Sequence, residues 1–168
     1  AGLMEQRTIA FIGGGNMARS LISGLLNAGH PAERIHVTDL DQDKLAALSD
    51  EFGIRTGTDN AAAVRAAEVV VLAVKPQFMA EMLEALTREL GSYGDKLVLS
   101  IAAGIQIARL SSLLGDHRNI VRAMPNTPAL IGAGITGLCA LPEVSADQRA
   151  AADRVLRAVG TTVWIEDE

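Results

Sequence analysis

The chain has 168 residues, a formal net charge of −5 and 49% hydrophobic residues, of which few are aromatic. This composition predicts one globular domain with an aliphatic core, and the scattered Lys and Arg residues argue against a nucleic-acid partner. We find no run long enough to span a membrane and no signal peptide, so we expect no membrane partner and a cytoplasmic location.

Short apolar runs alternate with amphipathic segments along the whole chain. The pattern predicts strands at residues 8–12, 35–38, 54–56, 69–74, 97–101, 119–124, 134–141 and 161–165. It predicts helices at residues 16–28, 41–52, 60–67, 78–90, 105–114 and 145–159, with a break in the chain at Pro76. Such alternation requires crossover connections, so we expect an α/β fold with a mainly parallel sheet and helices on both faces. No internal linker or repeat interrupts this single predicted domain, residues 4–168.

The stretch "IAFIGGGNMA" contains the spacing G-x-G-x-x-A in Gly13, Gly15 and Ala18, between a predicted strand and a predicted helix. In this context the first glycine permits a tight turn, the second lets backbone approach a pyrophosphate, and the alanine lets the helix pack closely on the strand. The free N–H groups at the start of the helix favour a phosphate. The motif therefore predicts a Rossmann-type domain that binds a dinucleotide.

An acidic residue is expected about 20 residues after this motif, at the end of the second strand. The stretch "HVTD" places Asp39 there. A carboxylate at this point accepts hydrogen bonds from the ribose hydroxyls of the dinucleotide. The alternative is a glycine turn that only packs a helix on a sheet, with Asp39 capping the next helix.

Three further segments follow predicted strands: "LAVKP", "SIAAG" and "MPNTP". Because ligands of open α/β sheets bind outside the carboxyl ends of the strands, we expect all three at the binding edge. The small residues of the second segment permit close approach of a ligand. The two prolines of the third segment make it a rigid loop.

The stretches "FIGGGNMA", "LAVKP", "SIAAG" and "RAMPNTP", in this order and spacing, resemble pyrroline-5-carboxylate reductase over residues 7–167. The "MPNTP" loop after "AVKP" is fairly specific, whereas the glycine motif alone is not. The resemblance implies reduction of a small-molecule imine, 1-pyrroline-5-carboxylate, to L-proline with NADPH or NADH as cofactor, which is a step of proline biosynthesis.

The resemblance also implies which residues contact the cofactor and the substrate. The predicted cofactor-binding residues are Ile12, Gly13, Gly14, Gly15, Asn16, Met17, Thr38, Asp39, Asn60, Ala73, Val74, Lys75, Pro76, Ile101, Ala102 and Ala103. The predicted substrate-proximal residues, which also border the nicotinamide, are Met124, Pro125, Asn126, Thr127 and Pro128. Lys75 either steers anions or is an ordinary surface lysine, and we expect Asn126 to hold loop backbone rather than ligand.

Members of this family also contain a second, all-helical domain with a Gly-Ser-Gly-Pro segment, which makes the dimer and supplies much of the substrate pocket. The present sequence reaches Glu168 without any such segment. We therefore expect it to be the cofactor-binding half of a homo-oligomeric protein. Whether this half turns over substrate alone is left open.

The end of the second strand departs from the pattern of members that prefer NADPH, which often carry small hydroxyl residues there. In this chain Asp39 follows Thr38, and no arginine comes directly after it. The carboxylate repels a 2′-phosphate, although Lys44 and Arg19 are cations that could reach the site. We predict that NADH binds at least as well as NADPH.

Hydride transfer to a protonated cyclic imine requires no metal, and we find no ligand cluster with metal-binding spacing. We identify no catalytic residue in this chain, and the resemblance places any side chain that donates a proton in the helical domain. His30, His36 and His117 fall at element ends or in polar turns, so we expect them to be solvated. The single cysteine, Cys139, is predicted to be buried.

Two other functions remain open at the level of sequence. One is another Rossmann oxidoreductase, of the type that includes the β-hydroxyacid dehydrogenases. The other is a non-catalytic module that binds NAD(P). The "MPNTP" loop favours the reductase, and a following helical region would distinguish it from a module.

Overall fold

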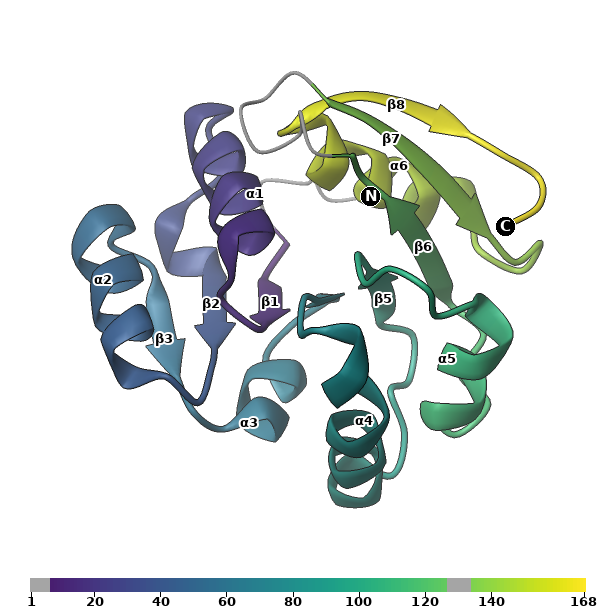
Figure 1. Ribbon diagram of the computed structural model, residues 1–168, viewed down its shortest axis with the longest axis horizontal. Coiled ribbons are helices and arrows are strands. Elements are labelled where there is room, and N and C mark those ends of the chain that lie inside the picture. The colour runs from purple at the N-terminus through teal and green to yellow at the C-terminus, as the bar shows by residue number, and fades with distance from the viewer. Residues whose placement is uncertain (1–6, 127–133) are drawn as a thin grey trace.

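The computed structural model describes residues 7–126 and 134–168, which form one eight-stranded sheet in the order β3-β2-β1-β4-β5-β6-β7-β8 (Figure 1). The first six strands of the chain are parallel, β7 runs antiparallel to β6, and β8 runs parallel to β7. The strands are β1 (Ile9–Ile12), β2 (Ile35–Thr38), β3 (Arg55–Gly57), β4 (Val69–Leu72), β5 (Leu97–Ser100), β6 (Ile120–Met124), β7 (Gly134–Ala140) and β8 (Gly160–Trp164). The predicted Rossmann-type α/β fold is confirmed.

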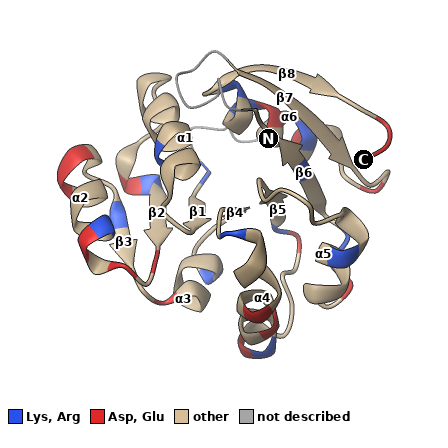
Figure 2. Ribbon diagram, viewed as in Figure 1, with Lys and Arg blue, Asp and Glu red and all other residues tan. Residues whose placement is uncertain are grey.

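Helices cover both faces of the sheet, as Figure 1 shows with α1 and α6 on one side and α3, α4 and α5 on the other. The helices are α1 (Asn16–Asn27), α2 (Gln42–Phe52), α3 (Asn60–Arg65), α4 (Pro76–Leu90), α5 (Ile107–Leu113) and α6 (Ala146–Arg157), with a 3₁₀ turn at Ala32–Arg34. Figure 2 shows that Lys and Arg are interspersed with Asp and Glu on α2 and α4. The face seen in this view therefore carries charges of both signs.

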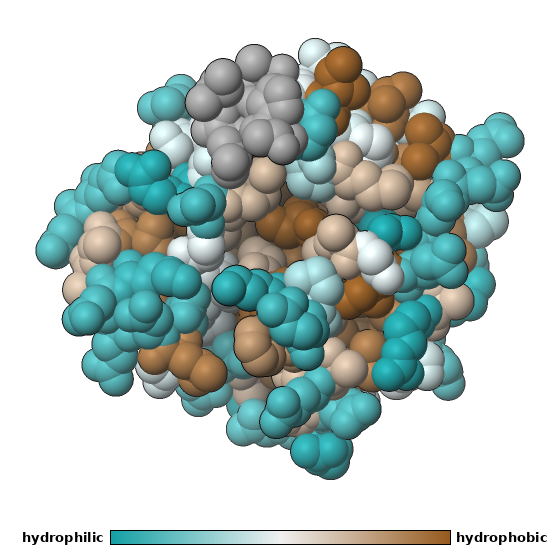
Figure 3. Space-filling model, in the orientation of Figure 1, coloured by the Kyte–Doolittle hydropathy of each residue, from teal (hydrophilic) through white to brown (hydrophobic). Residues whose placement is uncertain are grey.

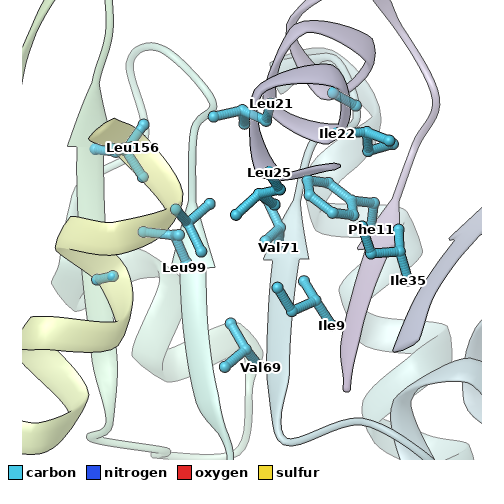
Figure 4. Close-up of a cluster of buried hydrophobic side chains, with 14 of the residues drawn as sticks. Ile9, Phe11, Leu21, Ile22, Leu25, Ile35, Val69, Val71, Leu99 and Leu156 are labelled. Carbon is cyan, nitrogen blue, oxygen red and sulfur yellow. The ribbon is translucent and has the colours of Figure 1, made fainter. Parts of the chain in front are cut away.

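Two hydrophobic clusters fix these layers, one on each face of the sheet. Alternate side chains of β1 point to opposite faces, so Phe11 joins the cluster under α1 while Ile12 joins the cluster under α3, α4 and α5. Figure 4 shows Leu21 and Leu25 of α1 packed over Phe11 and its neighbours in the sheet. Because β1 is fully buried on both faces, the loop that follows it starts from a rigid position.

Helix α4 begins two residues earlier than the sequence predicts. Pro76 is its first residue and does not break the chain. A proline fits the first turn of a helix because its missing N–H has no intrahelical partner there and its fixed φ is helical. The strand before it is shorter than predicted and ends at Leu72, which leaves Ala73 and Val74 in the connecting loop.

The edge formed by β7 and β8 carries exposed apolar side chains, which Figure 3 shows as brown atoms at that end of the sheet. Ile135, Val163 and Ile165 are between 38% and 57% exposed. The other face of this edge packs on α6, where the Arg149 guanidinium lies 5.4 Å from the Trp164 ring centroid. The apolar core thus extends to the last strand on one face.

Helix α1 packs so closely on the end of α6 that there is no room for a side chain at Gly24. A Cβ atom at Gly24 would lie 2.3 Å from the carbonyl oxygen of Ala158. We therefore expect Gly24→Ala to lower the free energy of unfolding by about 2 kcal/mol despite the better helix propensity of alanine. Urea denaturation measures this change, and Asn27→Ala on the exposed surface of the same helix is the control, with no loss expected. Equal stability of both variants would contradict the close packing.

Candidate functional site

The carboxyl ends of β1, β2, β4, β5 and β6 meet at one edge of the sheet, where most of the predicted binding residues lie. The chain proceeds outward from β1 in one direction through β2 and β3, and in the other through β4, β5 and β6. The change of direction lies between β1 and β4, and ligands of such sheets bind at this switch point. The loops after these two strands are therefore the centre of the site.

Gly13 is required where the β1 loop meets the β4 loop. Its φ of +105° lies in the region that favours glycine, and a Cβ there would be 2.7 Å from the carbonyl oxygen of Ala73. Its N–H donates to the carbonyl oxygen of Thr38 over 2.8 Å, while the Ala73 N–H donates to the carbonyl oxygen of Ile12 over the same distance. The turn after β1 is thereby fixed to both neighbouring strands.

Asp39 holds the glycine loop from the end of β2. Its Oδ2 accepts a hydrogen bond of 2.8 Å from the Gly14 N–H, and its Oδ1 accepts one of 3.0 Å from the Asp41 N–H. The Lys44 ammonium lies 3.7 Å from Oδ2. The carboxylate therefore links the glycine loop to the start of α2, and it stays at the edge with a side chain that is 17% exposed.

These contacts lower the pKa of Asp39. Burial alone would raise the pKa, but the hydrogen bonds from Asp41 and Gly14 and the charge of Lys44 outweigh that effect. The folded state consequently binds this proton less readily than the unfolded chain does. Asp39 therefore contributes stability above its unfolded pKa of about 3.9, and that contribution is lost as the pH falls through the lower pKa of the folded state.

We expect Asp39→Asn to lower the free energy of unfolding by about 1 kcal/mol at pH 7, since charge-assisted hydrogen bonds are lost. The deficit should begin to shrink as the pH falls below about 4, where the unfolded wild-type chain takes up the proton, and should vanish once the folded carboxylate is protonated as well. Urea denaturation at several pH values measures both effects. Asp50→Asn, on the exposed surface of α2, is the control. A deficit that is constant down to a pH of about 2 would contradict the role of the charge.

The N-terminus of α1 is open toward the edge. Gly15 is its N-cap residue and makes no side-chain cap, and a Cβ placed on Gly15 would meet no atom within 4 Å. Asn16, the first residue of the helix, is exposed. Backbone N–H groups without a capping side chain, beside open space, are what an anionic pyrophosphate requires, so these residues fit a dinucleotide.

The side chain of Thr38 lies inside the fold, and its predicted contact with the cofactor stays a prediction. It is 1% exposed, and its hydroxyl donates a hydrogen bond of 2.6 Å to Asn60 Oδ1. Asn60 is the first residue of α3, whose N-cap Asp59 accepts from the Ala62 N–H. Thr38 thus orients Asn60, which lies partly exposed at the adenine side of the predicted site.

A pocket of about 410 Å³ lies beside the glycine loop, where the β5 and β6 ends converge. Of the predicted residues, it is lined by Met17, Ile101, Ala103, Met124, Pro125 and Asn126. Asn126 Oδ1 accepts a hydrogen bond of 3.1 Å from the Ile135 N–H, so this side chain holds the start of β7. Thr127 and Pro128 lie outside the described residues. The pocket is mostly apolar and adjoins the N-terminus of α1 through Met17.

The β4 loop borders a second and larger cavity, of about 650 Å³, between the starts of α4 and α5. Pro76 lines it together with Gly104, Gln106, Arg109 and Arg122. Lys75, the residue before α4, is exposed. Ala102, which belongs to the loop after β5, is buried in the hydrophobic cluster under α3, α4 and α5.

The structure adds two residues to the site, Arg122 and Gly104. Each of them lines the 650 Å³ cavity and the 410 Å³ pocket. Sequence reasoning passed over Arg122, although an arginine inside an otherwise apolar strand is a visible signal. Arg19 pairs with Glu51, and its guanidinium carbon lies 5.5 Å from the centroid of the Phe52 ring. In this structure Lys44, and not Arg19, is the cation paired with Asp39.

The three histidines are more buried than the sequence predicts. His30 is 3% exposed, and Nε2 of His117 lies within hydrogen-bond distance, 2.8 Å, of the Lys96 carbonyl oxygen. His36 is half-buried, and burial together with the charge of Arg55 lowers its pKa. None of them lines either cavity, so the described part of the chain offers no histidine for proton transfer at the edge.

Within residues 7–126 and 134–168, no group of three His, Cys, Asp or Glu side chains is arranged to hold a metal ion. Cys139 is buried and free, and burial raises the pKa of its thiol. A search of the same residues finds no helix that combines the length and the apolar character needed to cross a membrane.

Known proteins share this architecture and much of the sequence. Pyrroline-5-carboxylate reductase of Haemophilus influenzae is 48% identical over 165 residues, which are 98% of this chain and 60% of that protein. The structure of a pyrroline-5-carboxylate reductase from Coxiella burnetii matches with a TM-score of 0.91 and 43% identity, over 96% of this chain and 60% of that one. The Plasmodium falciparum pyrroline carboxylate reductase with NADP bound matches with a TM-score of 0.83 and 25% identity, over 98% and 60% of the two chains.

These matches confirm the resemblance found in the sequence, and the chain spans about 60% of the length of the relatives it matches. A family model described as "NADP oxidoreductase coenzyme F420-dependent" matches residues 8–104. Because this match covers more than half of the chain, the chain belongs to that family of NADP oxidoreductases.

Proposed function

We propose that this chain binds NADPH or NADH at the carboxyl edge of its sheet, and that the protein to which it belongs reduces 1-pyrroline-5-carboxylate to L-proline. The observation that carries the cofactor assignment is the uncapped start of α1 beside the open space at Gly15. The names of the relatives support the substrate, since several pyrroline-5-carboxylate reductases are 45% or more identical to this chain.

In this proposal the pyrophosphate lies over Gly13, Gly14 and Gly15, with the first N–H groups of α1 directed at it. The adenosine ribose lies at Asp39 and the adenine near Asn60. The nicotinamide lies toward the 410 Å³ pocket, between the loops after β5 and β6. The loop after β4, which contains Ala73, Val74, Lys75 and Pro76, borders the path between the two ends of the cofactor.

The bound cofactor supplies a hydride to the imine carbon of the substrate. The residues of this chain orient the two reactants and shield the hydride transfer from water. Met17, Ile101 and Met124 provide apolar walls that exclude water, and Asn126 fixes one side of the pocket through its bond to Ile135. Among the described lining residues of this pocket, Arg122 and Asn126 carry the polar side chains, and we assign neither a proton-transfer role.

The proposal extends to partners and location. This chain covers 60% of the length of its relatives, which leaves room for a second domain. We propose that the second domain is helical, that it completes the substrate pocket and that it forms the contacts of a homo-oligomer. The free, buried Cys139 fits a reducing compartment, so we propose that the protein acts in the cytoplasm in proline biosynthesis. The domain formed by residues 4–168 is proposed to be its cofactor-binding unit.

The test is an assay of the protein encoded by the complete gene. We expect oxidation of NADPH or NADH that depends on 1-pyrroline-5-carboxylate and yields proline, against a reaction without the imine as control. Turnover of a 2-hydroxy acid or another imine instead would favour a different oxidoreductase. Cofactor binding without turnover of any of these substrates would favour a non-catalytic module.

A further inference from the structure

The side-chain carboxylate of Glu168 joins two parts of the fold that are far apart in the sequence. It pairs with Arg122 of β6 through a 2.6 Å contact between Oε2 and Nη1. The same carboxylate accepts the N–H of Ile107, the first residue of α5, at 3.0 and 3.1 Å. One carboxylate therefore connects β6 to the end of the loop at residues 101–106.

This ion pair is shielded from solvent, unlike the pair that Arg118 and Glu143 form on the surface. The side chains of Arg122 and Glu168 are 10% and 17% exposed, whereas those of Arg118 and Glu143 are 56% and 50% exposed. The Nε atom of Arg122 is buried and has no hydrogen-bond partner among the described residues. Arg122 thus depends on Glu168 for its charge compensation. Breaking a shielded ion pair lowers the free energy of unfolding more than breaking an exposed pair does.

The segment that carries Glu168 is itself anchored to the sheet. The Ile165 N–H donates to the Leu138 carbonyl oxygen over 2.8 Å, and the Cys139 thiol donates to the Glu166 carbonyl oxygen over 3.7 Å. Figure 1 shows this segment turning back beside the end of β7. The backbone that carries Glu168 is therefore fixed to the sheet. Its contact with Arg122 consequently restrains the position of this segment relative to β6, in addition to compensating the charge of Arg122.

Arg122 and Gly104 line both the 650 Å³ and the 410 Å³ cavities, so the linked elements form the wall between them. On the 410 Å³ side, this wall continues into Ile101, Ala103 and Met124. We propose that Glu168 is a positioning residue: through Arg122 and the Ile107 N–H it sets the distance between the loop after β5 and the end of β6, and so shapes the pocket for the nicotinamide half of the cofactor. This inference rests on the proposed cofactor site.

The test compares each cofactor, NADH and NADPH, with the matching ligand that lacks the nicotinamide, ADP-ribose and 2′-phospho-ADP-ribose. We expect Glu168→Gln to weaken cofactor binding about tenfold and to leave binding of the matching ligand within about twofold of wild type, because the ligand without nicotinamide does not reach the wall. Glu143→Gln, which breaks the exposed pair with Arg118, is the matched control and should change neither affinity. Isothermal calorimetry measures all of these affinities.

Hydrogen exchange of the ligand-free chain gives a second measurement. We expect faster exchange of the Ile107 amide and of residues 101–106 in Glu168→Gln, with no change in α2. If the single variant fails to fold, Arg122→Met/Glu168→Gln removes both charges and should fold, while it still loses affinity for NADH and NADPH and not for the ligands without nicotinamide.

Unchanged affinity for NADH and NADPH, together with unchanged exchange at Ile107, would overturn the inference. An equal loss of affinity for both ligands would also overturn it, because a general loss of structure affects both halves of the site. A folded wild-type chain that binds neither NADH nor NADPH would contradict the proposed function and, with it, the nicotinamide role of Glu168.

Discussion

Replacing Gly13 with alanine is expected to lower the free energy of unfolding by about 3 kcal/mol and to abolish measurable binding of NADPH and NADH. Two effects add: the positive φ disfavours any L side chain, and the new Cβ would lie 2.7 Å from the carbonyl oxygen of Ala73. To relieve that overlap, the loop after β1 must move away from the loop after β4. The proposed pyrophosphate site at the switch point is then lost. Urea denaturation and calorimetric titration measure the two losses separately.

Gly15→Ala is the matched control for this prediction. Gly15 has a φ of −76°, and a Cβ there meets no protein atom within 4 Å, so the fold should lose less than about 1 kcal/mol. The methyl group would instead occupy the open space at the start of α1 and weaken cofactor binding. Substitutions at two glycines, two residues apart, thus distinguish an effect on the free energy of unfolding from an effect on cofactor binding. A Gly13→Ala variant as stable as wild type would contradict the geometry of the turn.

Asp39→Ser is expected to shift the ratio of NADPH affinity to NADH affinity about 100-fold toward NADPH. In the proposed site the wild-type carboxylate would repel a 2′-phosphate and accept hydrogen bonds from the ribose of NADH, so its removal would favour NADPH and disfavour NADH. Lys44, now 3.7 Å from the carboxylate, would face the phosphate without a competing negative charge. Calorimetric titration of wild type and variant with both cofactors gives the ratio, and wild type should bind NADH at least as well.

Asp39→Asn is the control for this change, because it removes the charge and keeps an acceptor oxygen for the Gly14 N–H. Its ratio should fall between those of wild type and Asp39→Ser. A wild-type chain that clearly prefers NADPH would contradict the assignment of Asp39 as the discriminating residue. In that case the carboxylate would serve mainly to hold Gly14 and Asp41, as its hydrogen bonds show it does in this structure.

The fold could be predicted from the sequence because its signals are local. Each buried strand is a short apolar run, each helix has an apolar stripe, and the order of elements leaves few topologies. The glycine loop was predictable for the same reason, since Gly13, Gly15 and Ala18 act within one strand–turn–helix unit. The start of α4 was misplaced because proline is both a chain breaker and a good first residue of a helix.

The contacts that the sequence did not reveal are those between distant residues. The Thr38 hydroxyl donates to Asn60, which is 22 residues later in the chain. Arg122 and Glu168 are 46 residues apart, and nothing in the local pattern of either residue points to the other. Such pairs depend on the order of strands and on side-chain burial, which periodicity alone does not determine.

The most direct test of the account is a calorimetric titration of this chain with NADPH and with NADH. The account predicts saturable binding of one molecule per chain for at least one of them, and weaker binding in Gly15→Ala while the variant remains folded. A folded wild-type chain that binds neither cofactor would contradict the central claim that the open start of α1 is a dinucleotide site.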